Sequence, residues 1–154
     1  MTEDDVRYAA YLERMIFSDP WSEKVYRETL GIEGVVYLVA EDDEAQSEID
    51  AESKNRIVGV AGVRNIVGDG EITNVMISPD YRKRGLAYQL LEQLLKEGEQ
   101  IGIRDFTLEV RASNDAAIGL YEKLGFVGEG LRKNFYNHPA EDALIMWKRN
   151  TNVG

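Results

Sequence analysis

The spacing of apolar residues predicts two helices near the start of the chain. Residues 3–17 carry apolar side chains three or four positions apart, on one helical face: Val6, Ala9, Leu12 and Ile16. Thr2 is suited to cap the first turn of this helix, and Pro20 ends it. A second helix is expected between Ser22, another capping residue, and Gly31.

Two further helices are predicted in the second half. The clearest amphipathic stripe follows Gly85 and ends before Gly102, and it consists of Ala87, Leu90, Leu91, Leu94 and Leu95. Asn114 caps a last helix, which Gly125 closes, and Ala117, Tyr121 and Leu124 share one of its faces. Because seven residues make two helical turns, Asn114 and Tyr121 lie on the same side of that helix.

Six segments alternate in polarity or are rich in β-forming residues, which predicts strands: Gly34–Ala40, Ile57–Val63, Glu71–Ile77, Phe106–Val110, Leu131–Tyr136 and Ala143–Lys148. The first two are expected to pair antiparallel, Asp69-Gly70 is a tight-turn signal before the third, and the last two form a hairpin. The sum is an α/β (α+β) fold, a mixed sheet with helices on both faces, in a single domain of residues 1–154.

Composition excludes several kinds of chemistry. The chain has no cysteine and one histidine, which argues against disulfides, thiolate nucleophiles, Cys-ligated metals, a Ser-His-Asp triad and a His-rich metal site. A net charge of −10 argues against nucleic-acid binding. We expect no membrane association and a cytoplasmic location, because no apolar run reaches the length of a bilayer and the N-terminus lacks a signal peptide.

Much of the acidity is local. Residues 41–53 hold seven acidic residues and no basic one, and the remaining acidic residues nearly balance the 18 basic ones. We expect an acidic loop at 41–54 within the domain. Such a charge run is usually a solvated loop, and the alternative is a docking surface for a basic partner.

The segment Val75–Ala87 is predicted to form the end of a strand, a turn and the start of a helix. Three consecutive cations and a glycine lie between the turn and the helix. Unpaired N–H groups at a helix N-terminus, together with nearby Arg and Lys side chains, favour a bound phosphate. The sequence therefore predicts an anion site in this segment, which by itself would suit a nucleotide or a coenzyme.

This segment also carries a family resemblance. Arg82-Lys83-Arg84-Gly85-Leu86-Ala87 matches the Q/R-x-x-G-x-G/A pattern of the GNAT family of acetyl-CoA-dependent N-acetyltransferases. Residues 108–126, Phe17–Glu23 and Arg132–Tyr136 are similar to the branch of RimI-type ribosomal-protein-alanine N-acetyltransferases. The resemblance covers nearly the whole chain. It departs in three places: the family's first strand is expected to be absent or very short, the acidic loop at 41–53 is longer than expected of a bare RimI-like domain, and Phe135 stands where the branch usually has a tyrosine.

The resemblance implies transfer of an acetyl group from acetyl-CoA to a protein N-terminal α-amine, that of an alanine in a basic ribosomal protein. At neutral pH about a tenth of α-amino groups are neutral, against a few lysines in ten thousand, so the N-terminus is the easier acceptor. With no cysteine to carry the acetyl group, we expect direct transfer without an acetylated enzyme. No metal is expected, and the oligomeric state is left open.

Two residues are implied as catalysts. Glu109, whose side chain faces away from the apolar residues of its strand, would be the base that takes the proton from the amine, directly or through water. Its alternative is an exposed strand carboxylate or an ion pair with Arg111. Tyr121 would be the acid that protonates the departing thiolate, because its phenol is protonated at neutral pH. Its alternative is a core tyrosine with its hydroxyl at the rim.

The implied contacts to acetyl-CoA begin at the strand backbone and end in the helix: Val75, Met76, Ile77, Arg82, Lys83, Arg84, Gly85, Leu86, Ala87, Tyr88 and Asn114. Asn114 would contact the pantetheine arm, or it serves only as a helix cap. The implied acceptor wall comprises Phe17, Trp21, Asn134 and Tyr136, although aromatic residues are more often core than pocket.

Two other functions fit part of this pattern. One is acetylation of a small amine, either a polyamine or an aminoglycoside, because the acidic chain suits any cationic acceptor. The other is a non-catalytic acyl-CoA-binding module, against which the presence of both Glu109 and Tyr121 weighs. Turnover with N-terminal peptides, with an internal lysine and with spermidine separates the three.

Overall fold

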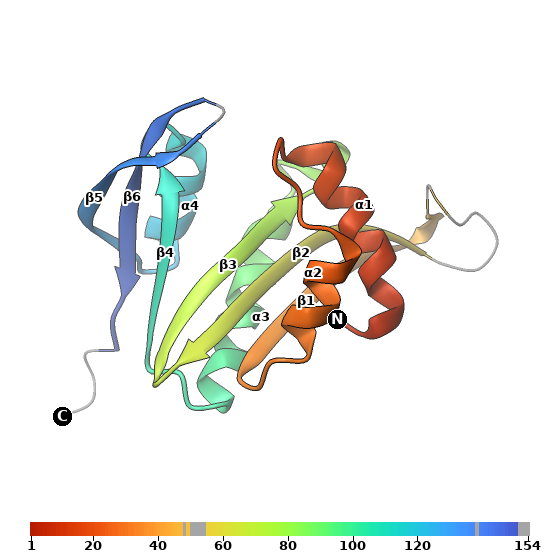
Figure 1. Ribbon diagram of the computed structural model, residues 1–154, viewed down its shortest axis with the longest axis horizontal. Coiled ribbons are helices and arrows are strands. Elements are labelled where there is room, and N and C mark those ends of the chain that lie inside the picture. Colours follow the sequence, from red (N-terminus) through yellow and green to blue (C-terminus); the bar gives the residue numbers. More distant parts are fainter. Residues whose placement is uncertain (48, 50–54, 138, 151–154) are drawn as a thin grey trace.

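The computed structural model describes residues 1–47, 49, 55–137 and 139–150. Figure 1 shows how helices and strands follow one another along the chain. The helices are η1 (Glu3–Asp5), α1 (Val6–Ile16), α2 (Glu23–Leu30), η2 (Pro79–Tyr81), α3 (Leu86–Gln100) and α4 (Asp115–Lys123). The strands are β1 (Val35–Gln46), β2 (Asn55–Ile66), β3 (Asp69–Ile77), β4 (Asp105–Arg111), β5 (Val127–Tyr136) and β6 (Glu141–Lys148).

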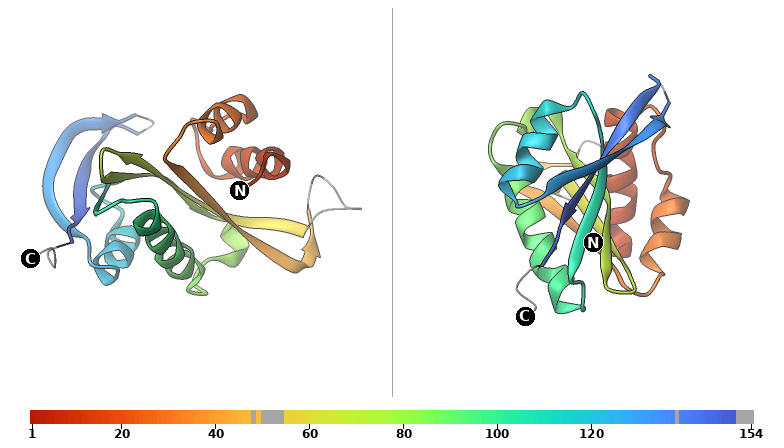
Figure 2. Two further views of the ribbon diagram at one scale, coloured as in Figure 1. Left: turned by 90° about the horizontal axis from the view of Figure 1, so that it is seen from below. Right: turned by 90° about the vertical axis from the view of Figure 1, so that its left-hand side faces the viewer.

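The strands form one mixed sheet in the order β1-β2-β3-β4-β6-β5. All neighbours run antiparallel except β3 and β4, which are parallel. Helices α1 and α2 cover one face, and α3 and α4 cover the other (Figure 2), so one apolar cluster forms on each side of the sheet. The predicted fold class is confirmed. No helix of the described residues is long and apolar enough to cross a bilayer.

Local capping signals set the helix boundaries as the sequence predicts. The Ser22 side chain accepts a hydrogen bond from the Val25 N–H at 3.2 Å, and α2 ends at Gly31. Asn114 Oδ1 accepts from the Ala117 N–H at 3.2 Å and begins α4. Thr2 precedes the first helical turn, and its N–H donates to Asp5 Oδ2 at 2.8 Å. These contacts satisfy N–H groups that the first turn of a helix leaves unpaired.

The chain enters its first helical turn at Glu3, and no strand precedes β1 within residues 1–34, all of which are described. This agrees with the expected lack of a leading strand. The N-terminal ammonium of Met1 instead donates to the Tyr37 carbonyl at 2.5 Å. The start of the chain is therefore held against β1.

Two predicted segments differ from the structure. The turn between β2 and β3 is Val67-Gly68, where both residues have positive φ, and Asp69-Gly70 already belongs to β3. The predicted acidic loop begins too early, because Glu41–Gln46 continue β1 and pair with Asn55–Ile57 through two register shifts. Residues 48 and 50–54 of that loop lie outside the described residues. The backbone pairing with β2 therefore keeps Glu41–Gln46 in a strand despite their negative charge.

Candidate active site

A cleft opens where β3 and β4 separate. The two strands pair only at their start, the last pair being Glu71 with Thr107, and beyond it β3 runs on to Ile77 and β4 to Arg111 without pairing to each other. Figure 1 shows the two strands diverging from this end. We call the opening between them the cleft. One wall of the cleft is the unpaired part of β3, and the other is the end of β4.

Two cavities lie along the cleft. The first, of about 630 Å³, borders the loop of residues 82–85 before α3. We call this loop the phosphate loop and the cavity the phosphate-loop cavity. It is lined by Ile77, Tyr81, Arg82, Lys83, Gly85, Leu86, Ala87, Tyr88, Gln89, Ala116, Leu120 and Lys123. Seven of the predicted coenzyme residues are among them. Gln89 and Lys123 were not predicted from the sequence, although Lys123 adds a cation to the lining that also holds Arg82 and Lys83.

The phosphate loop reaches α3 through two residues in the left-handed region, Lys83 with φ 64° and Gly85 with φ 73°. Gly85 is the N-cap of α3, so the N–H groups of the first turn face the loop. The Arg82 Nε donates to the Ile77 carbonyl at 3.2 Å, which ties the loop to the end of β3. The Arg84 guanidinium lies 4.9 Å from the Tyr81 ring centroid. This loop combines backbone donors, cations and a helix N-terminus, as anion sites do.

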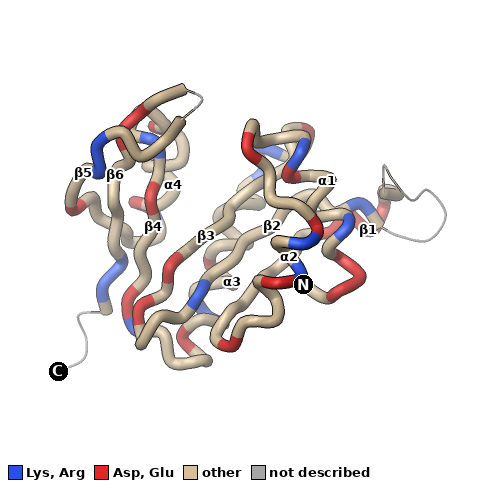
Figure 3. Tube along the Cα trace, in the orientation of Figure 1, with Lys and Arg blue, Asp and Glu red and all other residues tan. Residues whose placement is uncertain are grey.

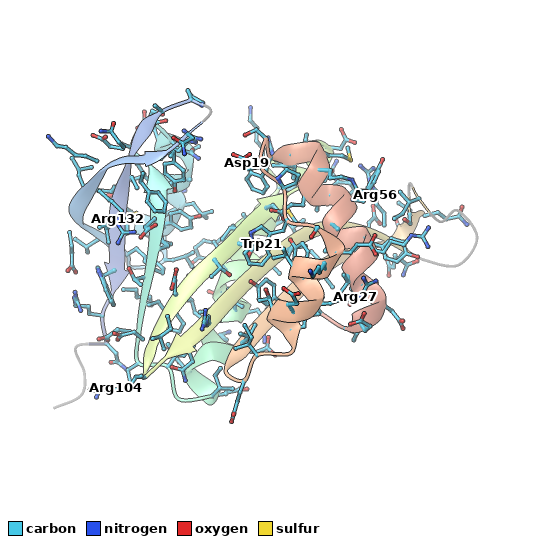
Figure 4. All side chains as sticks on the ribbon, viewed as in Figure 1. Asp19, Trp21, Arg27, Arg56, Arg104 and Arg132 are labelled. Carbon is cyan, nitrogen blue, oxygen red and sulfur yellow. The ribbon has the colours of Figure 1, made fainter. Side chains whose placement is uncertain are left out.

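The second cavity, of about 540 Å³, lies between the α1–α2 loop and the β5–β6 hairpin, and we call it the acceptor cavity. Its lining holds seven predicted site residues: Phe17, Trp21, Val75, Glu109, Asn114, Tyr121 and Tyr136. Figure 4 places Asp19 and Trp21 on the α1–α2 side and Arg132 on the side of β5. Both implied catalysts therefore border one cavity together with most of the implied acceptor wall.

Three predicted residues lie outside both linings. Met76 is buried in the cluster beneath α1 and α2, so only its backbone can face the cleft. Arg84 packs on Tyr81 instead of lining either cavity. Asn134 sits at a register shift of β5 with φ 53°, and its N–H donates to Asp142 Oδ1 at 2.9 Å.

Glu109 forms an ion pair across the sheet. Its Oε1 lies 3.0 Å from Arg132 Nη1, with the Glu109 side chain 28% and the Arg132 side chain 55% exposed. The other partner that the sequence suggested, Arg111, pairs instead with Glu141 at 3.5 Å and lies 4.5 Å from the Tyr136 ring centroid. The Glu109 carboxylate is thus partly open to the acceptor cavity.

Tyr121 is 8% exposed and packs edge-on against Phe126, with ring centroids 5.9 Å apart. Burial, with a smaller contribution from Tyr136, raises the pKa of Tyr121 to about 12. Within the described residues its hydroxyl makes no hydrogen bond. The phenol is therefore protonated over the whole physiological range. Burial, followed by the charge of Glu109, also raises the pKa of Tyr136.

Sequence reasoning missed a buried carboxylate at the acceptor cavity. Glu13 lies on α1, is 3% exposed and accepts a hydrogen bond from the Tyr26 hydroxyl at 2.5 Å. Burial raises its pKa, and the hydrogen bonds from Tyr26 and the Trp21 backbone oppose that shift. The signal was available, because Glu13 follows Ala9 by four residues on the apolar face of α1.

The described residues contain no group of three or more His, Cys, Asp or Glu side chains suited to hold a metal. The polar groups at the two cavities are backbone N–H groups, cations, tyrosine hydroxyls and the carboxylates of Glu13, Asp19 and Glu109. This set suits binding of a polyanion beside a proton transfer at a polar substrate.

Comparison with known proteins identifies the class. A model of the acetyltransferase (GNAT) family matches residues 7–126, so the chain belongs to this family. The family uses acetyl-CoA as its acetyl donor, and the chain is an acyltransferase.

Relatives narrow the branch. The ribosomal protein bS18-alanine N-acetyltransferase of Salmonella typhimurium is 34% identical over 148 residues, which cover 95% of this chain and 92% of that protein. The N-alpha-acetyltransferase RimI of Mycobacterium tuberculosis is 31% identical over 152 residues, 95% of this chain and 87% of that one. The crystal structure of the ribosomal-protein-S18-alanine N-acetyltransferase from Escherichia coli superposes with a TM-score of 0.83 at 31% identity, over 100% of this chain and 93% of that chain. The resemblance to the RimI-type branch is confirmed.

Proposed function

We propose that this protein transfers the acetyl group of acetyl-CoA to the α-amino group of a protein N-terminus, that of an alanine in a ribosomal protein. The observation that carries the proposal is the shared cavity of Glu109 and Tyr121, which lies along the same cleft as the phosphate-loop cavity. The names of the RimI-type relatives support the choice of a ribosomal protein as acceptor. A ribosomal substrate would place the reaction in the cytoplasm.

Acetyl-CoA would bind along the cleft. The diphosphate would accept hydrogen bonds from the N–H groups that begin α3, with Arg82 and Lys83 as counter-charges. The pantetheine arm would follow the unpaired edge of β3 toward Val75, passing Asn114. An N–H of the Val75 region would then donate to the thioester carbonyl, where negative charge develops during attack.

The chemistry follows from the two groups at the acceptor cavity. The Glu109 carboxylate accepts a proton from the α-amine, directly or through one water, and the amine nitrogen attacks the thioester carbon. The tetrahedral intermediate collapses as the C–S bond breaks and the amide forms. Tyr121 gives its phenolic proton to the coenzyme A thiolate. The proton held by Glu109 and the one lost by Tyr121 are exchanged with solvent, which restores the enzyme.

The acceptor peptide would lie between the α1–α2 loop and the β5–β6 hairpin. Phe17 and Trp21 would form one wall, and Tyr136 the other, with its ring held by Arg111. Asn134 lies outside the lining of the acceptor cavity. It would therefore contact only a peptide that is long enough to extend past the β5–β6 hairpin. The net charge of −10, much of it carried by residues 41–53, would favour encounter with a basic peptide, and acidic positions also occur on helices and strands elsewhere in the chain (Figure 3).

Three classes of acceptor test the proposal. Steady-state rates are measured with peptides that begin with Ala, Ser or Met, with an N-terminally blocked peptide that carries an internal lysine, and with spermidine. We expect turnover of the free N-terminal peptides, the Ala peptide best, and little of the other two. Preference for spermidine would refute the proposal that the acceptor is a protein. Binding of coenzyme A without turnover of any amine would refute the proposal that the protein is an N-terminal acetyltransferase.

A second test addresses the basic character of the acceptor. Neutralising the acidic residues of positions 42–52 with Asn or Gln should slow acetylation of a basic peptide at low salt. The effect should disappear at high salt, where charges more than about 3 Å apart are screened at 1 M. An unchanged low-salt rate would show that this acidic run does not guide the acceptor.

A further inference from the structure

The hydroxyl of Tyr37 reaches from one side of the sheet to the strand that borders the cleft. Tyr37 lies on β1, and its hydroxyl donates to Asn74 Oδ1 at 2.9 Å and lies 2.7 Å from Thr73 Oγ1. Both partners lie on β3, so the tyrosine spans β2, the strand between them. Tyr37 is 4% exposed. The contact therefore joins a buried side chain to two residues of the acceptor-cavity lining.

A glycine in β2 makes this crossing sterically feasible. Gly62 is the cross-strand partner of Tyr37, and a Cβ built on Gly62 would lie 2.3–2.7 Å from three atoms of the Tyr37 ring. Any other residue at position 62 would displace the ring. Glycine in the interior of a strand weakens the strand, so its presence here marks a close approach. The crossing thus depends on two positions from separate strands.

The two residues that Tyr37 holds lie at an irregularity of β3. Gly62 pairs with Asn74 and Val63 pairs with Ile72, which leaves Thr73 as an extra residue on β3. Bulges of this kind change the direction of a strand and of the groups that follow. Just before this point β3 loses its pairing with β4, after Glu71. The bulge therefore has β2 on one edge only, and the Tyr37 hydroxyl supplies a side-chain restraint.

We propose that Tyr37 is a positioning residue for acyl transfer: by holding Thr73 and Asn74, it fixes the bulge that aims the backbone of Val75 into the cleft. The inference rests on the proposed function, in which the Val75 region contacts the thioester carbonyl. It concerns a residue outside both cavity linings, two strands away from the cleft. Burial raises the pKa of Tyr37 to about 12, so the hydroxyl keeps its proton for Asn74 at every physiological pH.

Tyr37→Phe tests the proposal because it removes only the hydroxyl and leaves the ring above Gly62. A neutral hydrogen bond contributes about 1 kcal/mol, so we expect kcat to fall about 3- to 10-fold. Affinity for free coenzyme A, which has no acetyl group, should stay within about twofold, because the phosphate loop is unchanged. Hydrogen exchange of the backbone amides in residues 72–77 should become faster.

Two further variants separate positioning from stability. Thr73→Val removes one partner of the hydroxyl, so combining it with Tyr37→Phe should cost less than the two single changes together. Ile57→Val is the matched control, since Ile57 belongs to the same apolar cluster but has no side-chain group that can hydrogen-bond to the hydroxyl. It should lower the melting temperature and leave kcat unchanged at temperatures where the protein is folded.

The outcomes are distinct. A folded Tyr37→Phe enzyme with unchanged kcat would overturn the proposal, as would an equal loss of kcat in Ile57→Val at matched loss of melting temperature. If the wild type acetylates no peptide, the proposed function fails, and amide exchange still decides the present inference. Unchanged exchange in residues 72–77 would then refute the restraint, and faster exchange would support it independently of the reaction.

Discussion

Glu109 on β4 and Arg132 on β5 form an ion pair with 3.0 Å between Oε1 and Nη1, at the wall of the acceptor cavity. Arg111 lies two residues along the same strand but pairs with Glu141 of the hairpin. The proposed base is thus tied to the hairpin that forms one wall of the acceptor cavity. Its position depends on the pairing of β5 with β6 as well as on β4 itself.

Glu109→Gln should remove the base while keeping the shape of the side chain. We expect kcat to fall about 10²- to 10⁴-fold, the range for loss of a general base, with the dissociation constant of coenzyme A nearly unchanged. Glu129→Gln is the matched control, because Glu129 lies on the outer strand β5, pairs with Arg149 and lines neither cavity. Full activity of Glu109→Gln across pH would exclude Glu109 as the base.

The boundaries of helices were predictable because capping is local. Ser22, Gly31 and Asn114 are each within four residues of the groups they bond, so the signal is contained in a short stretch of sequence. The β2–β3 turn was misplaced by two residues because Val67 adopts a positive φ, which a β-branched residue seldom does. Asp69-Gly70 carries the common turn signal but lies inside β3.

Long-range pairing accounts for what the sequence could not predict. Glu41–Gln46 are in a strand because they pair with β2, which follows later in the chain. Glu109 pairs with Arg132 because the sheet brings the hairpin close to β4. The candidate site was predictable where a motif names it, as in Arg82–Tyr88. The buried hydrogen bond of Glu13 with Tyr26, by contrast, joins residues whose meeting follows only from the packing of α1 on α2.

Tyr121→Phe should remove the proposed acid with little change in packing. We expect kcat to fall about 100-fold, and the loss should be smaller for acetyl donors whose leaving thiol is more acidic and needs less protonation. The measurement is kcat for a series of donors with different leaving thiols. Equal losses for all donors would contradict a role of Tyr121 as the acid.

The raised pKa of Tyr121 also predicts a pH effect on stability. An unfolded tyrosine loses its proton near pH 10, whereas folded Tyr121 keeps it to about pH 12. The stability due to this group is therefore fully present below about pH 10 and is lost as the pH rises to about 12. Denaturant melts between these pH values should show a smaller alkaline loss for Tyr121→Phe than for the wild type.

Glu13→Gln should change the pH dependence of stability in the acid range. The pKa of Glu13 is raised by burial, so its contribution is present below the unfolded value of about 4.5 and is lost as the pH rises through the folded value. A glutamine still accepts the Tyr26 hydrogen bond but carries no charge. The melting temperature of the variant relative to the wild type should therefore rise between pH 4 and pH 8.

An opposite sign is expected for a control at the surface. The pKa of Glu129 is lowered by the Arg149 side chain, so its contribution is present above about pH 4.5 and is lost as the pH falls. Glu129→Gln should thus lose stability relative to the wild type on going from pH 4 to pH 8. The same trend in both variants would contradict a burial-raised pKa of Glu13.

The two ends of α3 offer a matched pair for the phosphate loop. Gly85 has φ 73° and Gly102 has φ 95°, and a Cβ at either position would meet no atom within 4 Å. Alanine at either site should therefore cost about 1–2 kcal/mol of backbone strain and nothing from crowding. The expected losses of folding stability are similar.

Their effects on catalysis should differ. Gly85 caps the helix whose first N–H groups are proposed to bind the diphosphate, whereas Gly102 lies beyond the far end of the helix and lines neither cavity. Gly85→Ala should raise the KM for acetyl-CoA about 10-fold, the equivalent of about 1.4 kcal/mol. Gly102→Ala should leave that KM unchanged at equal loss of melting temperature. If both variants raise the KM for acetyl-CoA equally, global loosening of α3 accounts for the effect, and the N-terminus of α3 is not the diphosphate site.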